Sequence, residues 1–146
     1  MDLVKKACNL LIENLGDKIV AVSLFGSLAR GEASKYSDVD FFIVVRNFND
    51  PNRRFKIYHY LYSVLKKDVT VIDIDENKLF RDDLKISPLL LNIIYDSIIL
   101  YDPTGRLTKL FDRIKYAIDK NLVRYKTPDG KYGWKPRKGI LSIIKV

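Results

Sequence analysis

The sequence has only one cysteine, Cys8, among its 146 residues. A single cysteine excludes an internal disulfide, and a reducing compartment is the usual location of such a chain. Hydrophobic runs are also short, and none approaches the ~20 residues that a membrane-spanning helix needs. Residues 1–16 alternate charged and apolar positions without the cleavage-site pattern of a signal peptide. We therefore expect a cytoplasmic protein that does not enter a membrane.

Acidic residues are scarce at the C-terminal end of the chain. Residues 105–146 contain 12 Lys and Arg against 3 Asp, a net charge of +9, whereas residues 1–104 contain 14 Lys and Arg against 15 Asp and Glu, a net charge of −1. A local excess of this size predicts an acidic partner, such as a nucleic acid, a nucleotide or an acidic protein. A solvated basic face without a partner is the alternative.

Hydrophobic periodicity predicts helices and strands that alternate along the chain. Helical spacing of apolar residues is present at 2–15, from Pro51 to 65, over most of 76–96 with a break at Ser87-Pro88, and at 106–120. Apolar runs predict strands at 18–25, 38–45, 69–75 and 97–101, and residues 127–130 form a turn signal in the tail. The strand at 38–45 is apolar on both faces, as in a sheet covered by helices. This order predicts an α/β (α+β) domain.

A pair of carboxylates stands at the start of the second apolar strand. Asp38 and Asp40 are two residues apart in the segment GSLARGEASKYSDVD. In a strand this spacing places both side chains on one face, ~6.6 Å apart along the strand. Two carboxylates near a buried strand repel each other, and a divalent cation such as Mg²⁺ removes this repulsion. The pair therefore predicts a metal site that shares its ion with a phosphate.

Gly26 and Ser27 stand at the opposite end of the same segment. They follow an apolar strand and are predicted to open a helix. Glycine lets the backbone approach a phosphate closely, and the free N–H groups at a helix start attract anions. The serine hydroxyl adds a donor. Together with the carboxylate pair, this turn predicts a site for a nucleoside triphosphate.

The ordered set Gly26-Ser27, Ala29-Arg30-Gly31 and Ser37-Asp38-Val39-Asp40, between two apolar strands, resembles the motif of the minimal nucleotidyltransferases of the DNA polymerase beta superfamily. Residues 88–105 and 124–135 are also similar to the corresponding parts of small archaeal members. The resemblance implies a nucleotidyltransferase fold with a mixed central sheet flanked by helices. It implies a core at 1–104, followed at 105–146 by a helix and a basic, hairpin-like tail packed on the core.

The resemblance also implies a chemistry. In this family an acceptor hydroxyl attacks the α-phosphate of a nucleoside triphosphate and pyrophosphate is released. Asp38 and Asp40 would hold two Mg²⁺ ions, with Mn²⁺ as an alternative, and Gly26 and Ser27 would hold the triphosphate. Arg30 would add positive charge near the phosphates or the acceptor, the alternative being a surface arginine.

The family has a third carboxylate in its site, and more than one residue of this sequence could correspond to it. It comes from a later strand, and Asp73 in VTVIDID is the first candidate, as a metal ligand or general base. Asp75 lies on the same strand face and competes with it. Some small members have Thr or Ser at this position, in which case Thr70 is the equivalent residue and the third carboxylate is missing. Nucleotide binding would remain in that case, while catalytic competence would be in doubt.

Three functions remain open at this stage. The first is transfer of AMP from ATP to an acceptor, as the antitoxin paired with a helical HEPN-type protein, in a homodimer or hetero-complex. The second is a module that binds nucleotide or masks a partner with little turnover. The third is an RNA-modifying nucleotidyltransferase whose basic tail, with Tyr132 and Trp134, binds RNA; alternatively, Trp134 attaches the tail to the core. Cys8 and His59 are predicted to be structural.

Overall fold

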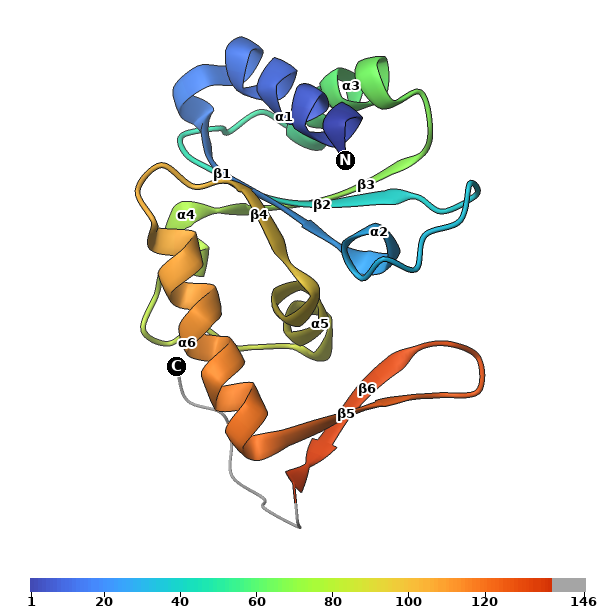
Figure 1. Ribbon diagram of the computed structural model, residues 1–146. Helices are drawn as coiled ribbons and strands as arrows, with labels where there is room; N and C mark the ends of the chain where they lie inside the picture. Colours follow the sequence, from blue (N-terminus) through green and yellow to red (C-terminus); the bar gives the residue numbers. More distant parts are fainter. Residues whose placement is uncertain (138–146) are drawn as a thin grey trace.

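A four-stranded mixed sheet forms the centre of the protein in the computed structural model, which describes residues 1–137 (Figure 1). The strands lie in the order β3 (Val69–Asp75), β2 (Val39–Val45), β1 (Ile19–Phe25) and β4 (Ile98–Tyr101). β2 pairs parallel with β3 and antiparallel with β1, and β4 pairs antiparallel with β1. The predicted α/β fold with a mixed sheet is therefore confirmed.

Helices cover both faces of this sheet. α1 (Asp2–Leu15) and α3 (Arg53–Leu65) lie on one face, and α5 (Pro88–Asp96) and α6 (Arg106–Asn121) lie on the other (Figure 1). A short 3₁₀ turn, η1 (Gly16–Lys18), connects α1 to the sheet. All seven residues of β1 are buried, as are six of the seven in β2. The two central strands therefore bury their side chains on both faces, as their continuous apolar sequences predict.

The predicted strands begin and end within one residue of the observed ones, whereas two helical predictions need correction. α3 begins at Arg53 and not at Pro51, because the Asp50 carboxylate accepts the Asn52 N–H at 2.8 Å and holds residues 51–52 in a turn. The segment 76–96 is less helical than expected. It contains α4 (Glu76–Leu79) and α5, with residues 80–87 in turns and irregular structure between them. The Ser87 hydroxyl accepts the Leu90 N–H at 3.1 Å and caps α5.

The C-terminal region ends in a hairpin of β5 (Leu122–Lys126) and β6 (Tyr132–Pro136), joined across the predicted turn. Trp134 packs against the apolar cluster beneath the sheet, and its indole Nε1 donates to the Asn92 amide oxygen at 3.0 Å. Trp134 thus attaches the hairpin to α5. Residues 138–146, which include Lys138 and the end of the predicted tail, lie outside the described residues.

None of the helices in residues 1–137 combines the length and the apolar composition that crossing a membrane would require.

α6 shares its core with the sheet. Its buried residues are Leu107, Leu110, Phe111, Ile114 and Ile118, and all of them belong to the cluster that includes strand residues of β1 and β2. The Phe111 ring lies 6.0 Å from the ring of Phe42 in β2. The hydrophobic cluster therefore extends across residues 104 and 105, the boundary predicted between the core and the C-terminal part that packs on it.

We expect the Phe111→Ala variant to lower the free energy of unfolding by about 3–5 kcal/mol, because it removes a ring that is 1% exposed. Urea unfolding followed by circular dichroism and by Trp134 fluorescence measures the loss. Tyr116→Ala, on the same helix but 65% exposed, is the control and should change stability by less than about 0.5 kcal/mol. Two separate transitions in Phe111→Ala would contradict a shared core.

Candidate active site

The segment 26–40 forms a turn that brings its two ends together. β1 ends at Phe25, which lies opposite Asp40 in the β1–β2 register. Gly26 then opens a one-turn helix, α2 (Gly26–Ala29), with a φ of +75°. A Cβ at Gly26 would lie 2.0 Å from Oδ2 of Asp40. Glycine is therefore needed twice, for its backbone conformation and for the space that the Asp40 carboxylate occupies.

Asp38 and Asp40 have different surroundings. Asp40 lies within β2 and is half-buried, whereas Asp38 directly precedes the strand and is exposed. The strand thus begins one residue later than predicted, and only one of the two carboxylates belongs to it. The charge of Asp38 nevertheless acts on Asp40. The Asp40 carboxylate is therefore held by the sheet, whereas the Asp38 carboxylate lies just before the strand begins.

The half-buried position of Asp40 destabilises its negative charge. Burial raises the pKa of the Asp40 carboxyl above its usual value, and the charge of Asp38 raises it further. A hydrogen bond with the Thr70 side chain and the positive charge of Arg30 act in the opposite direction, but burial dominates. A cation bound between the two carboxylates would relieve both the repulsion and the lost hydration.

Thr70, and not Asp73, is the neighbour of Asp40 on β3. Asp40 and Thr70 are direct partners in the parallel β2–β3 register. Because side chains alternate along a strand, Asp73 points to the opposite face of the sheet, toward α3. There its carboxylate is 3% exposed and accepts the Arg53 Nε–H at 2.6 Å and the Arg54 Nε–H at 2.8 Å. This placement corrects the expectation that Asp73 joins the carboxylate pair.

Asp75 does not join the pair either. It lies on the same face of β3 as Asp73, and its carboxylate accepts the Asn77 N–H at 2.9 Å as the N-cap of α4. The register therefore matches the alternative in which Thr70 occupies the position of the third carboxylate. Within residues 1–137, no group of three or more His, Cys, Asp or Glu side chains is arranged to hold a metal ion.

The donor set still fits a magnesium ion that is shared with a substrate. Mg²⁺ is usually bound through one or two carboxylates together with phosphate oxygens, and it keeps several waters. Asp40 supplies one such carboxylate beside the turn at Gly26, and Asp38, two residues before it, supplies a second whose charge acts on Asp40. Ser27 is half-buried in the first turn of α2. The geometry thus places Asp40 next to the turn that the sequence predicts to bind phosphate.

Residues 5–103 of the chain match the family model described as Polymerase beta, Nucleotidyltransferase. The chain belongs to this family. The nucleotidyltransferase is 32% identical over 113 residues to a candidate protein adenylyltransferase of Methanocaldococcus jannaschii, an alignment that covers 74% of this chain and 76% of the relative. The family that the motif predicts is therefore confirmed.

Solved structures share the fold of this nucleotidyltransferase at lower identity. A toxin–antitoxin complex with AMP-PNP contains a chain that is 20% identical, with a TM-score of 0.57 over 80% of this chain and 86% of that one. A complex of the tri-AMPylated HEPN toxin of Shewanella oneidensis with its MNT antitoxin has a TM-score of 0.53 at 19% identity, over 82% of this chain and 86% of that one. These likenesses confirm the nucleotidyltransferase fold.

Arg30 is held by carboxylates in this structure. Its Nη1–H donates to Asp96 at 2.8 Å and its Nε–H donates to Glu32 at 3.0 Å. Its guanidinium also lies over the Tyr132 ring, 4.7 Å from the centroid. A phosphate contact by Arg30 would therefore use its other N–H groups. The Arg30 charge still reaches Asp40 and stabilises its ionised form.

Asp96 joins the hairpin to the turn that carries the site. Its side chain is 4% exposed and accepts hydrogen bonds from Arg30 and from two nitrogens of Arg124 in β5, at 2.6 and 2.9 Å. The Tyr132 hydroxyl of β6 also donates to Glu32, which follows α2. Asp96 was not among the predicted site residues. Its signal in the sequence is that it is the single charged residue in the apolar segment 88–101.

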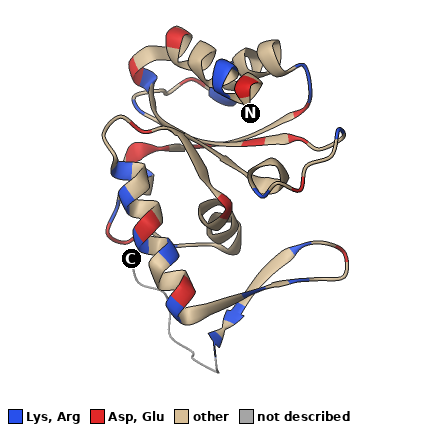
Figure 2. Ribbon diagram, viewed as in Figure 1, with Lys and Arg blue, Asp and Glu red and all other residues tan. Residues whose placement is uncertain are grey.

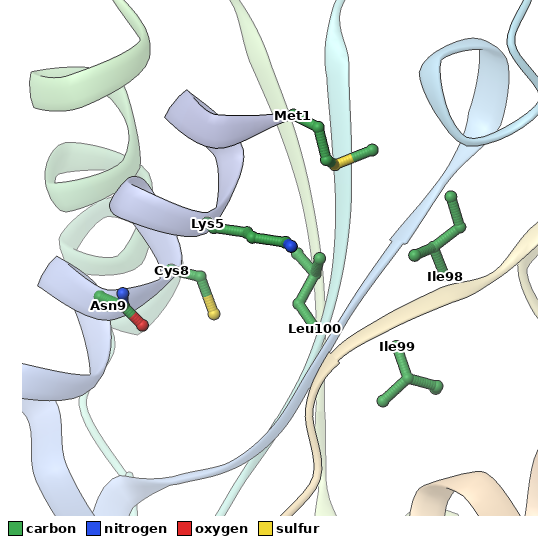
Figure 3. Close-up of a pocket in the computed structure, with 7 residues that line it drawn as sticks. All are labelled: Met1, Lys5, Cys8, Asn9, Ile98, Ile99 and Leu100. Atoms are coloured by element: carbon green, nitrogen blue, oxygen red, sulfur yellow. The ribbon is translucent and has the colours of Figure 1, made fainter.

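A pocket of about 500 Å³ lies away from this site, between α1 and the edge strand β4 (Figure 3). Its lining contains Lys5 and Cys8 but no carboxylate. Burial raises the pKa of the Cys8 thiol to about 11, so this thiol stays protonated at neutral pH. A protonated thiol is consistent with the structural role predicted for Cys8.

His59 is exposed on α3, which covers the face of the sheet opposite to that of Asp40.

We expect Gly26→Ala to weaken Mg²⁺-dependent ATP binding by about tenfold or more, because the new methyl group displaces the Asp40 carboxylate. Isothermal titration calorimetry measures the change. Gly31→Ala is a matched control, since Gly31 has a φ of +74° and nothing within 4 Å of an added Cβ. It should carry the same backbone strain and bind ATP like the wild type. Equal losses in both variants would refute the steric argument.

We expect Asp73→Asn to lower the free energy of unfolding at pH 7 by about 1–3 kcal/mol, because a neutral amide with one acceptor oxygen replaces the buried carboxylate that Arg53 and Arg54 share. Burial opposes the charge of Asp73, but the hydrogen bonds from Arg54 and Arg53 outweigh it and hold its pKa below the usual value. This stabilisation is present above the unfolded-state pKa of about 4 and is lost as the pH falls through the folded-state pKa. Urea unfolding at several pH values measures it.

Asp40→Asn is the matched comparison for Asp73→Asn. The pKa of Asp40 is raised, so its ionised form costs stability at pH 7, and its removal should leave the free energy of unfolding unchanged or higher. Nucleotide binding should show the reverse pattern, with a loss in Asp40→Asn and none in Asp73→Asn. An Asp73→Asn protein of normal stability that has lost nucleotidyltransferase activity would return Asp73 to the catalytic set.

Proposed function

We propose that this nucleotidyltransferase transfers AMP from ATP to a hydroxyl group of a protein partner, in a reaction that requires Mg²⁺. The observation that carries the proposal is the contact between the Asp40 carboxylate and the backbone at Gly26. This contact supports the proposal because Asp40 lies directly beside a turn whose backbone N–H groups would receive a phosphate. No side chain at Gly26 separates the two parts of the site.

In this proposal Asp38 and Asp40 hold a Mg²⁺ ion, or Mn²⁺ in its place, and the triphosphate lies against Gly26 and Ser27. The bound ion would neutralise charge on the phosphates. Two carboxylates with Thr70 beside them suit one ion shared with ATP. A second ion would take most of its ligands from ATP and water. Arg30 would add positive charge from the end of α2.

The transfer forms a bond between the acceptor oxygen and the α-phosphorus of ATP. The bond from this phosphorus to the bridging oxygen of pyrophosphate breaks, and the hydroxyl proton is released to solvent. The residues of the chain act by positioning, because phosphoryl transfer depends mainly on orientation and charge stabilisation. Gly26 and Ser27 orient the phosphates, and Asp40, fixed within β2, sets the position of the acidic pair.

The acceptor proposed here is a hydroxyl side chain of a HEPN-type helical protein, bound in a hetero-complex. The relative from M. jannaschii carries the name of a protein adenylyltransferase, and one fold neighbour is a complex that contains an AMPylated HEPN toxin. The hairpin borders the site through the contact between Tyr132 and Glu32. Its exposed lysines, Lys126, Lys131 and Lys135, suit an acidic surface on such a partner.

A partner-masking module with little turnover is a second candidate. The observation that favours it is the placement of Thr70 where other family members carry a third carboxylate. In that case ATP would bind, but the transfer would be slow or absent. Mutations of Asp38 and Asp40 would then leave neutralisation of the partner unchanged.

The test begins with calorimetric titration of ATP, GTP, CTP and UTP, with and without Mg²⁺, into the wild type and into Asp38→Asn/Asp40→Asn. We expect Mg²⁺-dependent binding with preference for ATP in the wild type and none in the double variant. A HEPN-type protein from the same organism is then incubated with the enzyme and ATP. Mass spectrometry should find AMP on this protein, with one pyrophosphate released for each AMP. Metal-dependent binding without any transfer would favour the masking module, and no binding would refute the proposal.

A further inference from the structure

A cluster of basic residues surrounds a hollow at the far end of the sheet from the carboxylate pair. The hollow has a volume of about 220 Å³ and lies between the segment after α4 and the first half of α6. Its lining residues are Phe80, Arg81, Asp82, Arg106, Lys109, Leu110 and Arg113. Four of them are positively charged and one is negatively charged. Figure 2 shows basic residues on the end of α6 that lies near α4.

The helical repeat of α6 gathers three of these cations on one side. Arg106, Lys109 and Arg113 are spaced three and four residues apart, which places them in a row along the helix. Leu110, between them, is buried against the core and contributes to the floor of the hollow. Leu107, Leu110 and Phe111 are buried in the core and fix the orientation of the helix about its axis. The row of cations therefore stays on the side of the helix that borders the hollow.

Phe80 forms the other part of the floor and orients one guanidinium. The guanidinium carbon of Arg106 lies 4.1 Å from the centroid of the Phe80 ring. Such stacking holds an arginine in place while its N–H groups stay available at the edge. The hollow therefore has an apolar base with charged donors around it.

Carboxylates of the chain neutralise only part of this charge. Arg81 forms a bidentate pair with Asp83 at 2.9 and 3.0 Å. Glu76 accepts from Arg46 at 2.5 Å and from Arg106 at 3.5 Å, so one carboxylate serves two arginines. Among residues 1–137, no ion pair joins Lys109 or Arg113 to a carboxylate within 4.0 Å. A bound anion would offset this uncompensated positive charge.

We propose that this hollow binds a phosphate or diphosphate group of a ligand, independently of the proposed AMP transfer. Arginine pairs with phosphate through two parallel hydrogen bonds, and lysine adds a point charge. A volume of about 220 Å³ is smaller than the roughly 300–1,000 Å³ of pockets that enclose whole small molecules. The hollow would thus enclose the anionic group and leave the rest of the ligand outside.

The position of the hollow separates it from the carboxylate pair. α4 begins directly after Asp75, which lies five residues beyond Thr70 on β3. At ~3.3 Å per residue, Asp75 is about 16 Å along the strand from Thr70, the neighbour of Asp40. α2 and α4 accordingly lie at opposite ends of the sheet (Figure 1). One phosphate group cannot occupy both places.

The test uses Asp38→Asn/Asp40→Asn as the background, so that the carboxylate pair does not contribute. Inorganic pyrophosphate without Mg²⁺ is titrated calorimetrically into this protein and into the same protein with Lys109→Gln/Arg113→Gln. We expect binding that becomes about tenfold weaker or more when both cations are removed. Lys115→Gln/Lys120→Gln is the matched control, because it removes the same charge from α6 outside the hollow.

A single-stranded RNA oligonucleotide, titrated in parallel, distinguishes the source of the phosphate. Salt-sensitive RNA binding that depends on Lys109 and Arg113 would identify a nucleic-acid backbone. Pyrophosphate binding alone would identify a free phosphorylated ligand. Equal losses in the hollow and control variants, or no binding of either probe, would overturn the proposal. AMP transfer by the Lys109→Gln/Arg113→Gln protein should match the wild type, so the two proposals can fail separately.

Discussion

The candidate active site depends on one contact, in which the Asp40 carboxylate lies against the Cα of Gly26. β1 leads into the turn at Gly26 and Ser27, and β2 pairs beside β1 with Asp40 directly opposite Phe25. A side chain at Gly26 would occupy the place of the carboxylate oxygen. The antiparallel register of β1 and β2 and the missing side chain therefore have to be present together. Because both strands are buried, this register is also the one that fills the core.

The carboxylates on the two faces of the sheet have different surroundings. On the face toward α5 and α6, no ion pair joins Asp40 to a cationic side chain among residues 1–137, and burial leaves Asp40 with a raised pKa. On the face toward α3, Asp73 is neutralised by two arginines and has a lowered pKa. A carboxylate that already has two guanidinium partners is satisfied without a metal, whereas an acidic pair without them is not. The contrast separates a stabilising carboxylate from one that is suited to a cation.

Asp96 connects the site to the C-terminal part of the chain. Its carboxylate forms ion pairs with Arg30, at the end of α2, and with Arg124 in β5. The Tyr132 ring packs near both guanidinium groups. The hairpin is thereby held beside the turn at Gly26. Much of the positive charge of residues 105–137 lies in two regions of the molecule. The hairpin lysines border the site, while the cations at the start of α6 surround a hollow at the other end of the sheet.

The sequence determined the features that depend on neighbouring residues. Apolar runs located the four strands to within a residue, the turn at 127–130 located the hairpin, and the spacing of Gly26 and Ser27 with Asp38 and Asp40 identified the family. Local patterns of this kind follow from the strand period and from backbone conformation.

Tertiary structure alone decided which side chain faces Asp40. Asp73 and Thr70 differ by an odd number of positions on β3, so only the β2–β3 register shows that Thr70 is the neighbour and that α3 supplies the partners of Asp73. The role of Asp96 likewise rests on Arg30, 66 residues away in sequence, and the packing of the whole domain brings the two together.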